Sequence, residues 1–346
     1  MNSTIMLFLA QDGITNGAIY ALLGFGLVLV FAVTRVILIP QGEFITFGAF
    51  TYAALSSGTL PRTAQLACAL GVIAFCVELV SIRHQLSIRR LVRAALLFVI
   101  MPAVIWLVAM IAAKYSRSVP ANLAVSLLIV APIGLYIYRI VYQPMAHASV
   151  LVLLIASVGV HLALQGMGLV FFGAEGMRAP PITEVAFSIG PLRVTGQALA
   201  VYVIAALLIV GLWLFFGYTL YGKALRATAV NRVGARLVGV RTVLSGQMAF
   251  VLAAAIGAIS GILIVPMTTI YYDSGFLVGL KGFIAAIVGG LGSYPLTAMA
   301  AVAVGLVEAF SSFYASNFKE VIVFTLIVPV LLLRSLAVPE VEEEKD

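Results

Sequence analysis

The sequence predicts an all-α polytopic membrane protein with about ten transmembrane helices and one half-span. Of its 346 residues, 63% are apolar and only 10% are charged, and the mean hydropathy is +1.17. A soluble domain has roughly 45–50% apolar and about 25% charged residues, so this chain has too few polar side chains to cover a surface in water. Its apolar residues also come in runs long enough to cross a bilayer.

These apolar runs locate the expected spans, because a helix needs about 20 apolar residues to cross the hydrocarbon core. The segment 282–291 is too short to cross and too apolar for a water-exposed loop. It is expected to be a half-span or re-entrant helix, which is tolerated where it is buried in protein or lines a cavity. The expected spans are 12–33, 43–57, 64–81, 94–113, 121–139, 149–172, 198–216, 244–265, 296–314 and 318–336.

Two basic loops set the expected orientation. The segments 82–93 and 217–243 contain clusters of Arg and Lys and no acid, which is typical of cytoplasmic loops under the positive-inside rule. Four expected spans separate them, so both loops fall on one side, and the N-terminus and segment 173–197 fall outside. The C-terminus, with the acidic tail 339–346, is expected inside if 282–291 counts as a crossing. These loops explain the net charge of +7, so no nucleic-acid partner is expected.

Two glycine-containing runs interrupt the expected spans and are candidates for a translocation path. One is the sequence Pro-Gln-Gly-Glu at 40–43, and the other is Gly-Gly-Leu-Gly-Ser at 289–293. Broken helices at membrane depth commonly line the path of transporters, although plain helix packing is the alternative for any single glycine. The path-lining candidates are Gln41, Gly42, Glu43, Gly289, Gly290, Gly292 and Ser293.

Ionisable residues inside the spans need a cavity or a partner, since each costs about 2.5–3.5 kcal/mol on translocon scales. Glu43 is either a path-lining carboxylate or a cap at a helix N-terminus. Glu308 is expected to pair structurally, with a path role as the alternative. Lys281 is expected to mark the membrane interface, with a substrate carboxylate as its alternative partner. Glu78 is expected to pair with Arg83.

The segment 221–242 is a basic, moderately amphipathic connector between two spans. Small Ala and Gly residues alternate with its arginines, which favours docking onto a protein partner. Adhesion to anionic lipid is the alternative, but it would favour Trp, Phe or Leu.

Signatures of catalysis are missing from the sequence. It contains no HExxH, CxxC or GxSxG string and no GxxxxGK[ST] phosphate loop. The chain is therefore not expected to be an enzyme, to hold a metal or other cofactor, or to bind ATP itself.

Six segments in order along the chain carry motifs that resemble one family. They include NGAIYALLGFGLVLVF at 16–31, QGEFITFGAF at 41–50, IYRIVYQP at 137–144 and GLKGFIAAIVGGLGSYP at 279–295. The other two are 154–165 and 222–239, and 308–312 and 318–323 match as well. Together they resemble the LivH-type permease subunits of branched-chain amino acid ABC transporters.

The resemblance implies a single permease domain, 1–346, in which inverted repeats of broken helices surround a path. It also implies a location in the bacterial inner membrane and three kinds of partner. These are a second permease subunit forming a heterodimer, two cytoplasmic ATPases that hold the ATP, and a periplasmic substrate-binding protein. A coupling helix at 222–240 is expected to contact the ATPases through Gly222, Lys223, Arg226, Ala227, Arg232, Ala235 and Gly239.

Three departures from the family pattern stand out. Region 60–115 begins a stretch of three spans where the family has room for one, which predicts an inserted helical hairpin. The family's Asn-Phe-Ala-His before Gly-Glu is Leu38-Ile39-Pro40-Gln41 here, and Leu296 replaces a glycine. The second departure lies near the expected path and leaves the substrate open.

The substrate is expected to be a branched-chain or related amino acid, with urea, short amides or other small carboxylates as alternatives. A different class, an ion-coupled secondary transporter, would use Glu43 and Glu308 as coupling carboxylates. An intramembrane enzyme would depend on His161 or Glu308.

Overall fold

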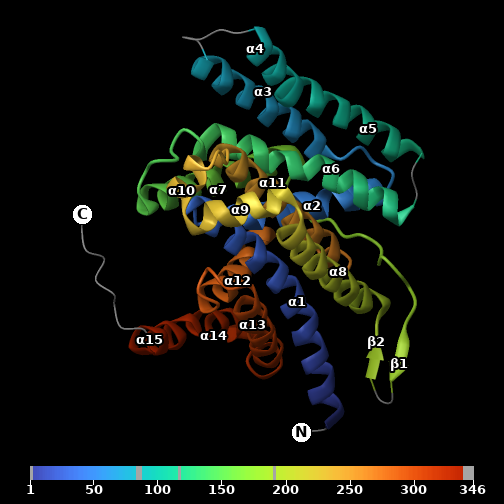
Figure 1. Ribbon diagram of the computed structural model, residues 1–346. Helices are drawn as coiled ribbons and strands as arrows, with labels where there is room; N and C mark the ends of the chain where they lie inside the picture. The colour runs from blue at the N-terminus through green and yellow to red at the C-terminus, as the bar shows by residue number, and fades with distance from the viewer. Residues whose placement is uncertain (1–2, 83–87, 116–117, 190–191, 338–346) are drawn as a thin grey trace.

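The computed structural model describes residues 3–82, 88–115, 118–189 and 192–337, and these residues form a helical bundle (Figure 1). Within them, eight helices are long and apolar enough to cross a membrane. This confirms the predicted all-α membrane fold. The crossing helices are α1 (Ser3–Thr34), α3 (Arg62–Ile82), α4–α5 (Ile88–Ala95 and Met101–Tyr115), α6 (Val119–Ile137), α7 (Val150–Phe172), α8 (Gly196–Tyr218), α11 (Thr242–Ile264) and α13 (Tyr294–Tyr314).

Two of the crossing helices contain a widened turn. A π-helical segment, Leu96–Ile100, joins α4 to α5 just before Pro102, and a second one, Tyr138–Tyr142, extends α6. Proline has no N–H to donate to the preceding turn, which accounts for the irregular backbone at the first of these sites. The remaining described structure includes a small antiparallel hairpin between α7 and α8, made of β1 (Phe187–Ile189) and β2 (Leu192–Val194).

Two helices are too short to cross. α2 (Gln41–Ser56) has 16 residues and α12 (Ser274–Val288) has 15. At 1.5 Å per residue they extend about 24 and 22 Å, less than the roughly 30 Å of the hydrocarbon core. Every residue from Gln41 to Leu55 is buried, so α2 lies inside the protein. The half-span expected at 282–291 therefore exists, but it starts earlier, because Gly275 and Gly279 pack within the helix instead of breaking it.

The last expected span, 318–336, is instead two short helices. α14 (Lys319–Thr325) follows a 3-10 turn at Ser316–Phe318, and α15 (Ile327–Ala337) follows α14 directly. Pro329 lies in the first turn of α15. In a continuous helix the Pro329 ring would clash with the carbonyl of Thr325, so α14 ends at Thr325 and a new helix, α15, begins at Ile327.

The core consists of two sets of three helices, and in each set a short helix lies between two long ones in the order of the chain. In the first set, α1 and α6 are long and α2 is short, and in the second, α11 and α13 are long and α12 is short. α1 packs on α12 and α13, and correspondingly α11 packs on α2 and α6. α1 also packs on α11, and α2 packs on α12. The same contacts are therefore found when α1, α2 and α6 are matched with α11, α12 and α13. Thr34 at the end of α1 lies near Arg232, in the segment from which α11 starts, so α1 and α11 run in opposite directions. The two sets are therefore related as the expected inverted repeat.

The helices predicted to form an inserted hairpin make a separate layer. α3 and α4–α5 lie on the outer side of α6 in Figure 1, and α3 packs on both α5 and α6. Glu78, which was expected to pair with Arg83, accepts a hydrogen bond from the Nε–H of Arg139 at the end of α6. Arg83 lies outside the described residues. The Glu78–Arg139 pair therefore connects the layer of α3 and α4–α5 to α6 in the core.

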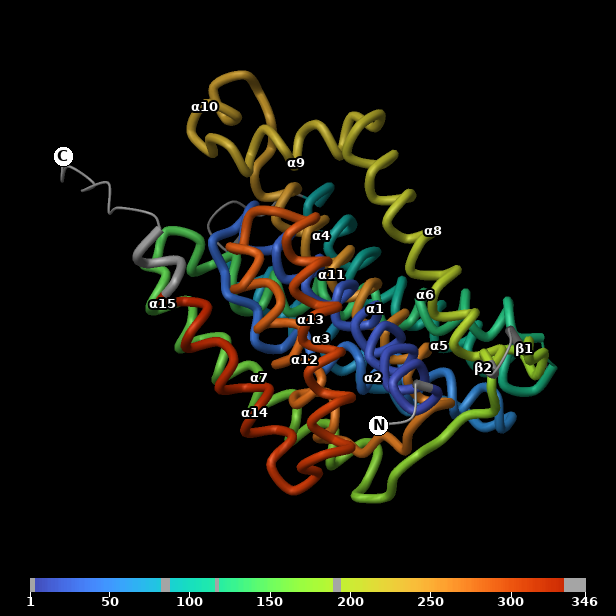
Figure 2. Tube along the Cα trace, turned by 90° about the horizontal axis from the view of Figure 1, so that it is seen from below, coloured from blue at the N-terminus to red at the C-terminus, as the bar shows by residue number. Residues whose placement is uncertain are grey.

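The two ends of the bundle carry different structures (Figure 2). At one end α8 leads into α9 (Leu220–Val230) and α10 (Arg232–Leu237), and Arg232 donates to the Ala146 carbonyl, 3.3 Å away, in the α6–α7 connection. Arg139 and Glu78 lie at this end too, which places α4 on the same side as α10. The β1–β2 hairpin lies at the opposite end of α8. The positive-inside rule makes the α10 end cytoplasmic.

The two short helices touch at glycines. A Cβ built on Gly275 would lie 2.1 Å from the Gly42 carbonyl oxygen, and one built on Gly42 would lie 2.4 Å from the Gly275 oxygen. The Gly275 N–H also donates to the Thr46 hydroxyl, 3.1 Å away. Small residues let membrane helices approach closely. This contact leaves no room for a side chain at either Gly42 or Gly275.

We expect Gly275→Ala to destabilise the protein by about 1–3 kcal/mol, because the added methyl forces α2 and α12 apart. Gly211→Ala is the matched control, since a Cβ there meets nothing within 4 Å and alanine is the better helix former. Thermal unfolding of the purified protein in detergent measures both. Equal shifts in melting temperature for the two variants would contradict the close contact.

Candidate functional site

Glu43 and His161 form a buried polar pair where three helices meet. The Nδ1 of His161 on α7 lies 2.9 Å from the Oε1 of Glu43 on α2. The His161 ring also stacks on Phe276 of α12, with centroids 4.3 Å apart. Glu43 is fully buried, and its Oε2 has no hydrogen-bond partner among the described residues. This pair joins α7 to the starts of both short helices.

The capping role considered for Glu43 is wrong. Pro40 occupies the N-cap of α2 and no side chain caps that end, while the Glu43 carboxylate faces His161. Sequence reasoning did not pair these two residues. A signal was present, because His161 shares one face of α7 with buried Ser157 and Leu164, and a histidine in a span needs a partner.

Gln41 and Gly42 lie in helix contacts beside this pair. The Gln41 side-chain amide donates to the Ala253 carbonyl on α11, 3.0 Å away. A Cβ on Gly26 of α1 would lie 2.6 Å from the same amide nitrogen, so an added methyl there would displace the Gln41 amide. Gln41 is buried and its Oε1 has no hydrogen-bond partner among the described residues. The three candidates at 41–43 thus lie at the junction of α1, α2, α11 and α12.

The second group of path candidates lies at the other end of α12. The chain reverses there at Gly290, with φ of +85°, and Leu291, with φ of 55°. The Leu291 N–H donates back to the Ala286 carbonyl at 2.8 Å and closes the helix end. Ser293 then caps α13 by accepting from Leu296 N–H at 3.4 Å.

The two groups of path candidates are therefore separate. Gly289 is buried against Thr297, and Gly292 is exposed. Residues 41–43 meet the first turn of α12, whereas 289–293 follow its last turn, about 21 Å further along the helix axis. The structure places the candidates at both ends of α12 and does not bring them into one pocket.

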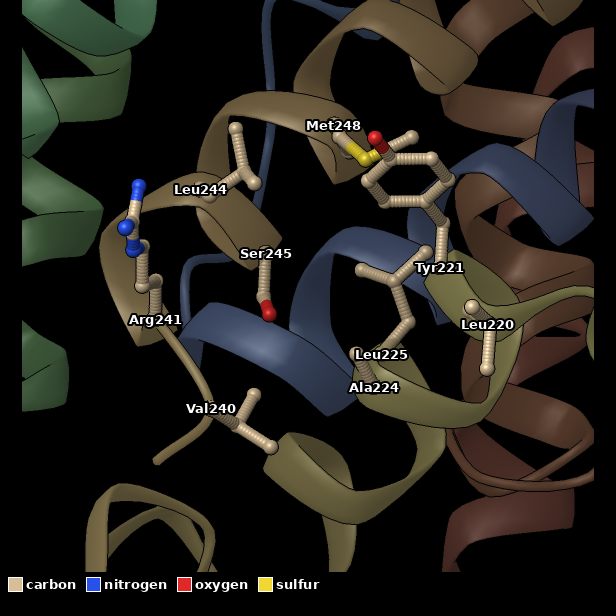
Figure 3. Close-up of a pocket in the computed structure, with 9 residues that line it drawn as sticks. All are labelled: Leu220, Tyr221, Ala224, Leu225, Val240, Arg241, Leu244, Ser245 and Met248. Atoms are coloured by element: carbon tan, nitrogen blue, oxygen red, sulfur yellow. The ribbon is translucent and has the colours of Figure 1, made fainter. Parts of the chain in front are cut away.

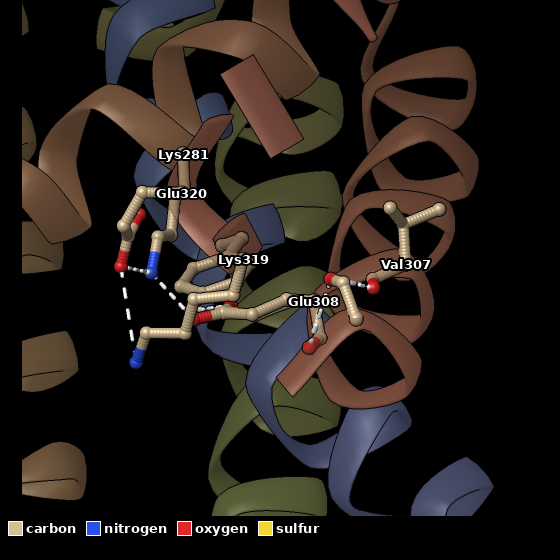
Figure 4. A network of polar contacts seen from close by, with 7 residues as sticks. Lys281, Val307, Glu308, Lys319 and Glu320 are labelled. Atoms are coloured by element: carbon tan, nitrogen blue, oxygen red, sulfur yellow. Dashed lines mark hydrogen bonds and ion pairs between the residues drawn. The ribbon is translucent and has the colours of Figure 1, made fainter. Parts of the chain in front are cut away.

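A buried ionic network links the C-terminal elements (Figure 4). The Nζ of Lys281 on α12 lies 2.5 Å from Glu308 Oε1 on α13 and 3.3 Å from Glu320 Oε1 on α14. The hydroxyl of Tyr20 on α1 donates to the other oxygen of Glu308, and Lys281 lies over the Tyr20 ring. Only 5% of Lys281 is exposed, and its partners in the structure are carboxylates of the chain itself. Glu308 has the structural pairing that was its favoured interpretation.

The expected coupling helix consists of two helices, α9 and α10. The hydroxyl of Thr219 accepts from Gly222 N–H at 2.9 Å and starts α9. The Asn231 side chain accepts from Gly234 N–H at 2.8 Å and starts α10. Asparagine favours a helix N-cap, which explains a new helix at this point instead of a continuous one.

The expected coupling residues differ in exposure. Lys223, Arg226, Ala227 and Gly239 are exposed at the cytoplasmic end. Gly222 and Ala235 are buried, and a Cβ on Gly222 would lie 2.1 Å from the Phe215 carbonyl, so these two residues shape the segment. Arg232 is half-buried and donates to the α6–α7 connection.

A cavity of about 200 Å³ lies between α9 and α11 (Figure 3). Its walls are mainly apolar, and Arg241 and Ser245 contribute the charged and hydroxyl groups. The cavity lies next to the expected coupling residues of α9. It is lined by Leu220, Tyr221, Ala224, Leu225, Val240, Arg241, Leu244, Ser245 and Met248.

These features define a polytopic membrane permease, a transport component with buried half-helices in its core and a basic segment at its cytoplasmic end. The family model described as "Branched-chain amino acid transport system / permease component" matches residues 9–332, and the chain belongs to this family. It is accordingly a multi-pass protein of the inner membrane, as predicted, and one component of a larger transport system.

The chain is similar to several permeases with established names. It is 29% identical over 235 residues to the high-affinity branched-chain amino acid transport system permease protein LivH of Escherichia coli (strain K12), covering 65% of this chain and 76% of the relative. The LivH of Salmonella typhimurium matches to the same extent. The protein BraD of Pseudomonas aeruginosa is 29% identical over 233 residues, 64% of this chain and 76% of BraD. No solved structure matches.

We expect Lys281→Met to destabilise the protein by about 3–5 kcal/mol, because it leaves two carboxylates without their buried counter-charge. Adding Glu308→Gln to Lys281→Met should recover part of the loss. Lys319→Met is the control, since its exposed ammonium lies 3.9 Å from Glu320 and such pairs contribute about 0–1 kcal/mol. Thermal unfolding in detergent ranks the three variants. A Lys281→Met protein as stable as Lys319→Met would contradict the network.

We expect the substitutions Glu43→Leu and His161→Leu to couple in a double-mutant cycle by about 0.5–3 kcal/mol, because each alone leaves a buried polar partner unpaired. Ser157→Ala supplies the control cycle with Glu43→Leu. Ser157 lies one turn away on α7 and bonds to Tyr142 instead, so these effects should add. Additive effects in both cycles would show that Glu43 and His161 do not interact.

Proposed function

We propose that the chain is the membrane permease of an ATP-driven, binding-protein-dependent ABC importer for branched-chain or related amino acids. The observation that carries this proposal is the pair of short helices, α2 and α12, which start beside each other in the core of an inverted repeat. Half-helices that begin inside a bundle present free backbone groups and positive dipole ends, and transporters use these to pass polar substrates. The names of the relatives support the class of substrate.

The proposed path runs along α12. Gln41, Gly42 and Glu43 lie at its N-terminal end. The turn containing Gly289, Gly290, Gly292 and Ser293 lies at its other end, and the next residue, Tyr294, packs on Phe216 at the cytoplasmic end of α8. Tight binding along this path would slow release, so selectivity belongs to the periplasmic binding protein. The permease supplies alternating access as the helices of each repeat rock around α2 and α12.

ATP is proposed to act from outside the chain, in two cytoplasmic ATPases, and a second permease subunit completes a heterodimer. The exposed residues Lys223, Arg226, Ala227 and Gly239 offer these ATPases a basic surface with small side chains. Gly222, Arg232 and Ala235 support that surface from within. No cofactor or metal is assigned to the permease itself.

The proposal is tested by what co-purifies with the chain from its native membrane in mild detergent. We expect the wild type to retain two ATPases and a second permease, and Arg226→Glu to lose the ATPases. Lys114→Glu is the control, because it reverses an exposed charge at the opposite end of the hairpin layer and should lose neither partner. A wild-type chain that purifies alone or as a homo-oligomer would contradict the importer.

An ion-coupled secondary transporter is not favoured. It needs carboxylates that are free to bind an ion, but Glu308 is engaged by Lys281 and Tyr20, and Glu43 by His161. Labelled leucine uptake in cells that lack the partner ATPases separates the two classes. The importer requires that uptake be lost, whereas an ion-coupled carrier would keep it. Competition by urea, amides or small carboxylates tests the alternative substrates.

A further inference from the structure

The turn of the inserted hairpin contains a short helix, α4, with two different faces. Residues three and four apart share one face of a helix, so its basic and apolar residues separate completely. The basic face consists of Arg89, Arg90 and Arg93, all exposed. The apolar face consists of Ile88, Leu91 and Val92, which are 82, 37 and 52% exposed. The chain therefore leaves both faces of α4 largely uncovered.

The apolar face continues without interruption into the membrane-facing side of α5. Beyond Val92, the exposed residues Leu96, Ile100 and Val104 follow at intervals of four, each about half exposed. This row passes from α4 through the π-helical segment into a transmembrane helix. Since the α5 part of the row faces lipid, the α4 part lies at the edge of the same lipid surface.

The position of α4 is fixed at the cytoplasmic boundary. The Glu78–Arg139 pair anchors the end of α3 to α6 on the side where α10 lies. Figure 1 shows α4 at the outer edge of the bundle, beyond α3. Glu78 is the single acidic residue in the sequence of 60–115, and it pairs with Arg139.

We propose that α4 binds the anionic headgroups of phospholipids at the cytoplasmic surface of the membrane. In this arrangement its apolar face enters the acyl region, and Arg89 and Arg93 bind lipid phosphate. Cationic amphipathic helices bind membranes in this way, and the cytoplasmic leaflet carries the anionic lipids that attract arginine. A protein partner is less well supported, because the apolar row continues directly into lipid-facing α5.

The complete transporter, reconstituted in nanodiscs with equal parts phosphatidylglycerol and phosphatidylcholine, tests this proposal. Native mass spectrometry then measures which lipids stay bound to the released complex. We expect the wild type to be enriched in phosphatidylglycerol, and the double variant Arg89→Gln/Arg93→Gln to lose at least half of that enrichment. The charge-preserving variant Arg89→Lys/Arg93→Lys should keep it. Lys114→Gln, an exposed base at the opposite end of the hairpin, should also keep it.

The outcomes separate lipid from protein. Unchanged enrichment in Arg89→Gln/Arg93→Gln, with the complex eluting intact, overturns the proposal. Loss of a partner subunit from the same variant also overturns it, because α4 would then contact protein. A reduced enrichment in Lys114→Gln equal to that of the double variant would show a general charge effect and would exclude a site at α4.

Discussion

The close contact between the backbones of α2 and α12 determines how the surrounding helices pack. A helix of 15 or 16 residues cannot cross the hydrocarbon core, and its free ends carry backbone groups that lipid cannot satisfy. Such a helix is stable only when it is enclosed by others. The crossing at Gly42 and Gly275 brings the two short helices together, and the long helices α1, α6, α11 and α13 enclose them.

Buried charges then connect this enclosed pair to the periphery. Glu43 of α2 reaches His161 of α7, and Lys281 of α12 reaches Glu308 of α13 and Glu320 of α14. Each short helix is therefore tied by a polar pair to a more peripheral helix in its own half of the chain. A rocking motion of one half against the other must either carry these pairs along intact or separate them, so they bear directly on alternating access.

The sequence predicts the parts of this structure that depend on local composition. Apolar runs locate the crossing helices, the arginine clusters set the orientation, and the glycine run before Ser293 marks the break between α12 and α13. The path candidates at 41–43 also fall at the core junction of α2 with α11 and α12.

The structure differs from the sequence prediction where a residue's environment depends on contacts between distant helices. Hydropathy records how apolar a segment is and not what encloses it, so it does not predict that Lys281 is buried and paired with both Glu308 and Glu320. The partners of Glu78 and Glu43 come from helices 61 and 118 residues away, and no local pattern identifies them. Two helix breaks do have local signals in the sequence. Asn231 is a capping residue at the start of α10, and Pro329 lies in the first turn of α15, but both segments were predicted to be continuous helices.

Opening and closing of the path around α12 would change the accessibility of Ser293 to reagents in water. A cysteine is placed at Ser293 in a chain with Cys68→Ala and Cys76→Ala, and the complete transporter is reconstituted with its cytoplasmic side accessible. The rate of alkylation by a membrane-impermeant maleimide is measured without nucleotide and with a non-hydrolysable ATP analogue. Opening and closing around α12 requires the two rates to differ several-fold. Equal rates, in a complex that transports substrate, would contradict it.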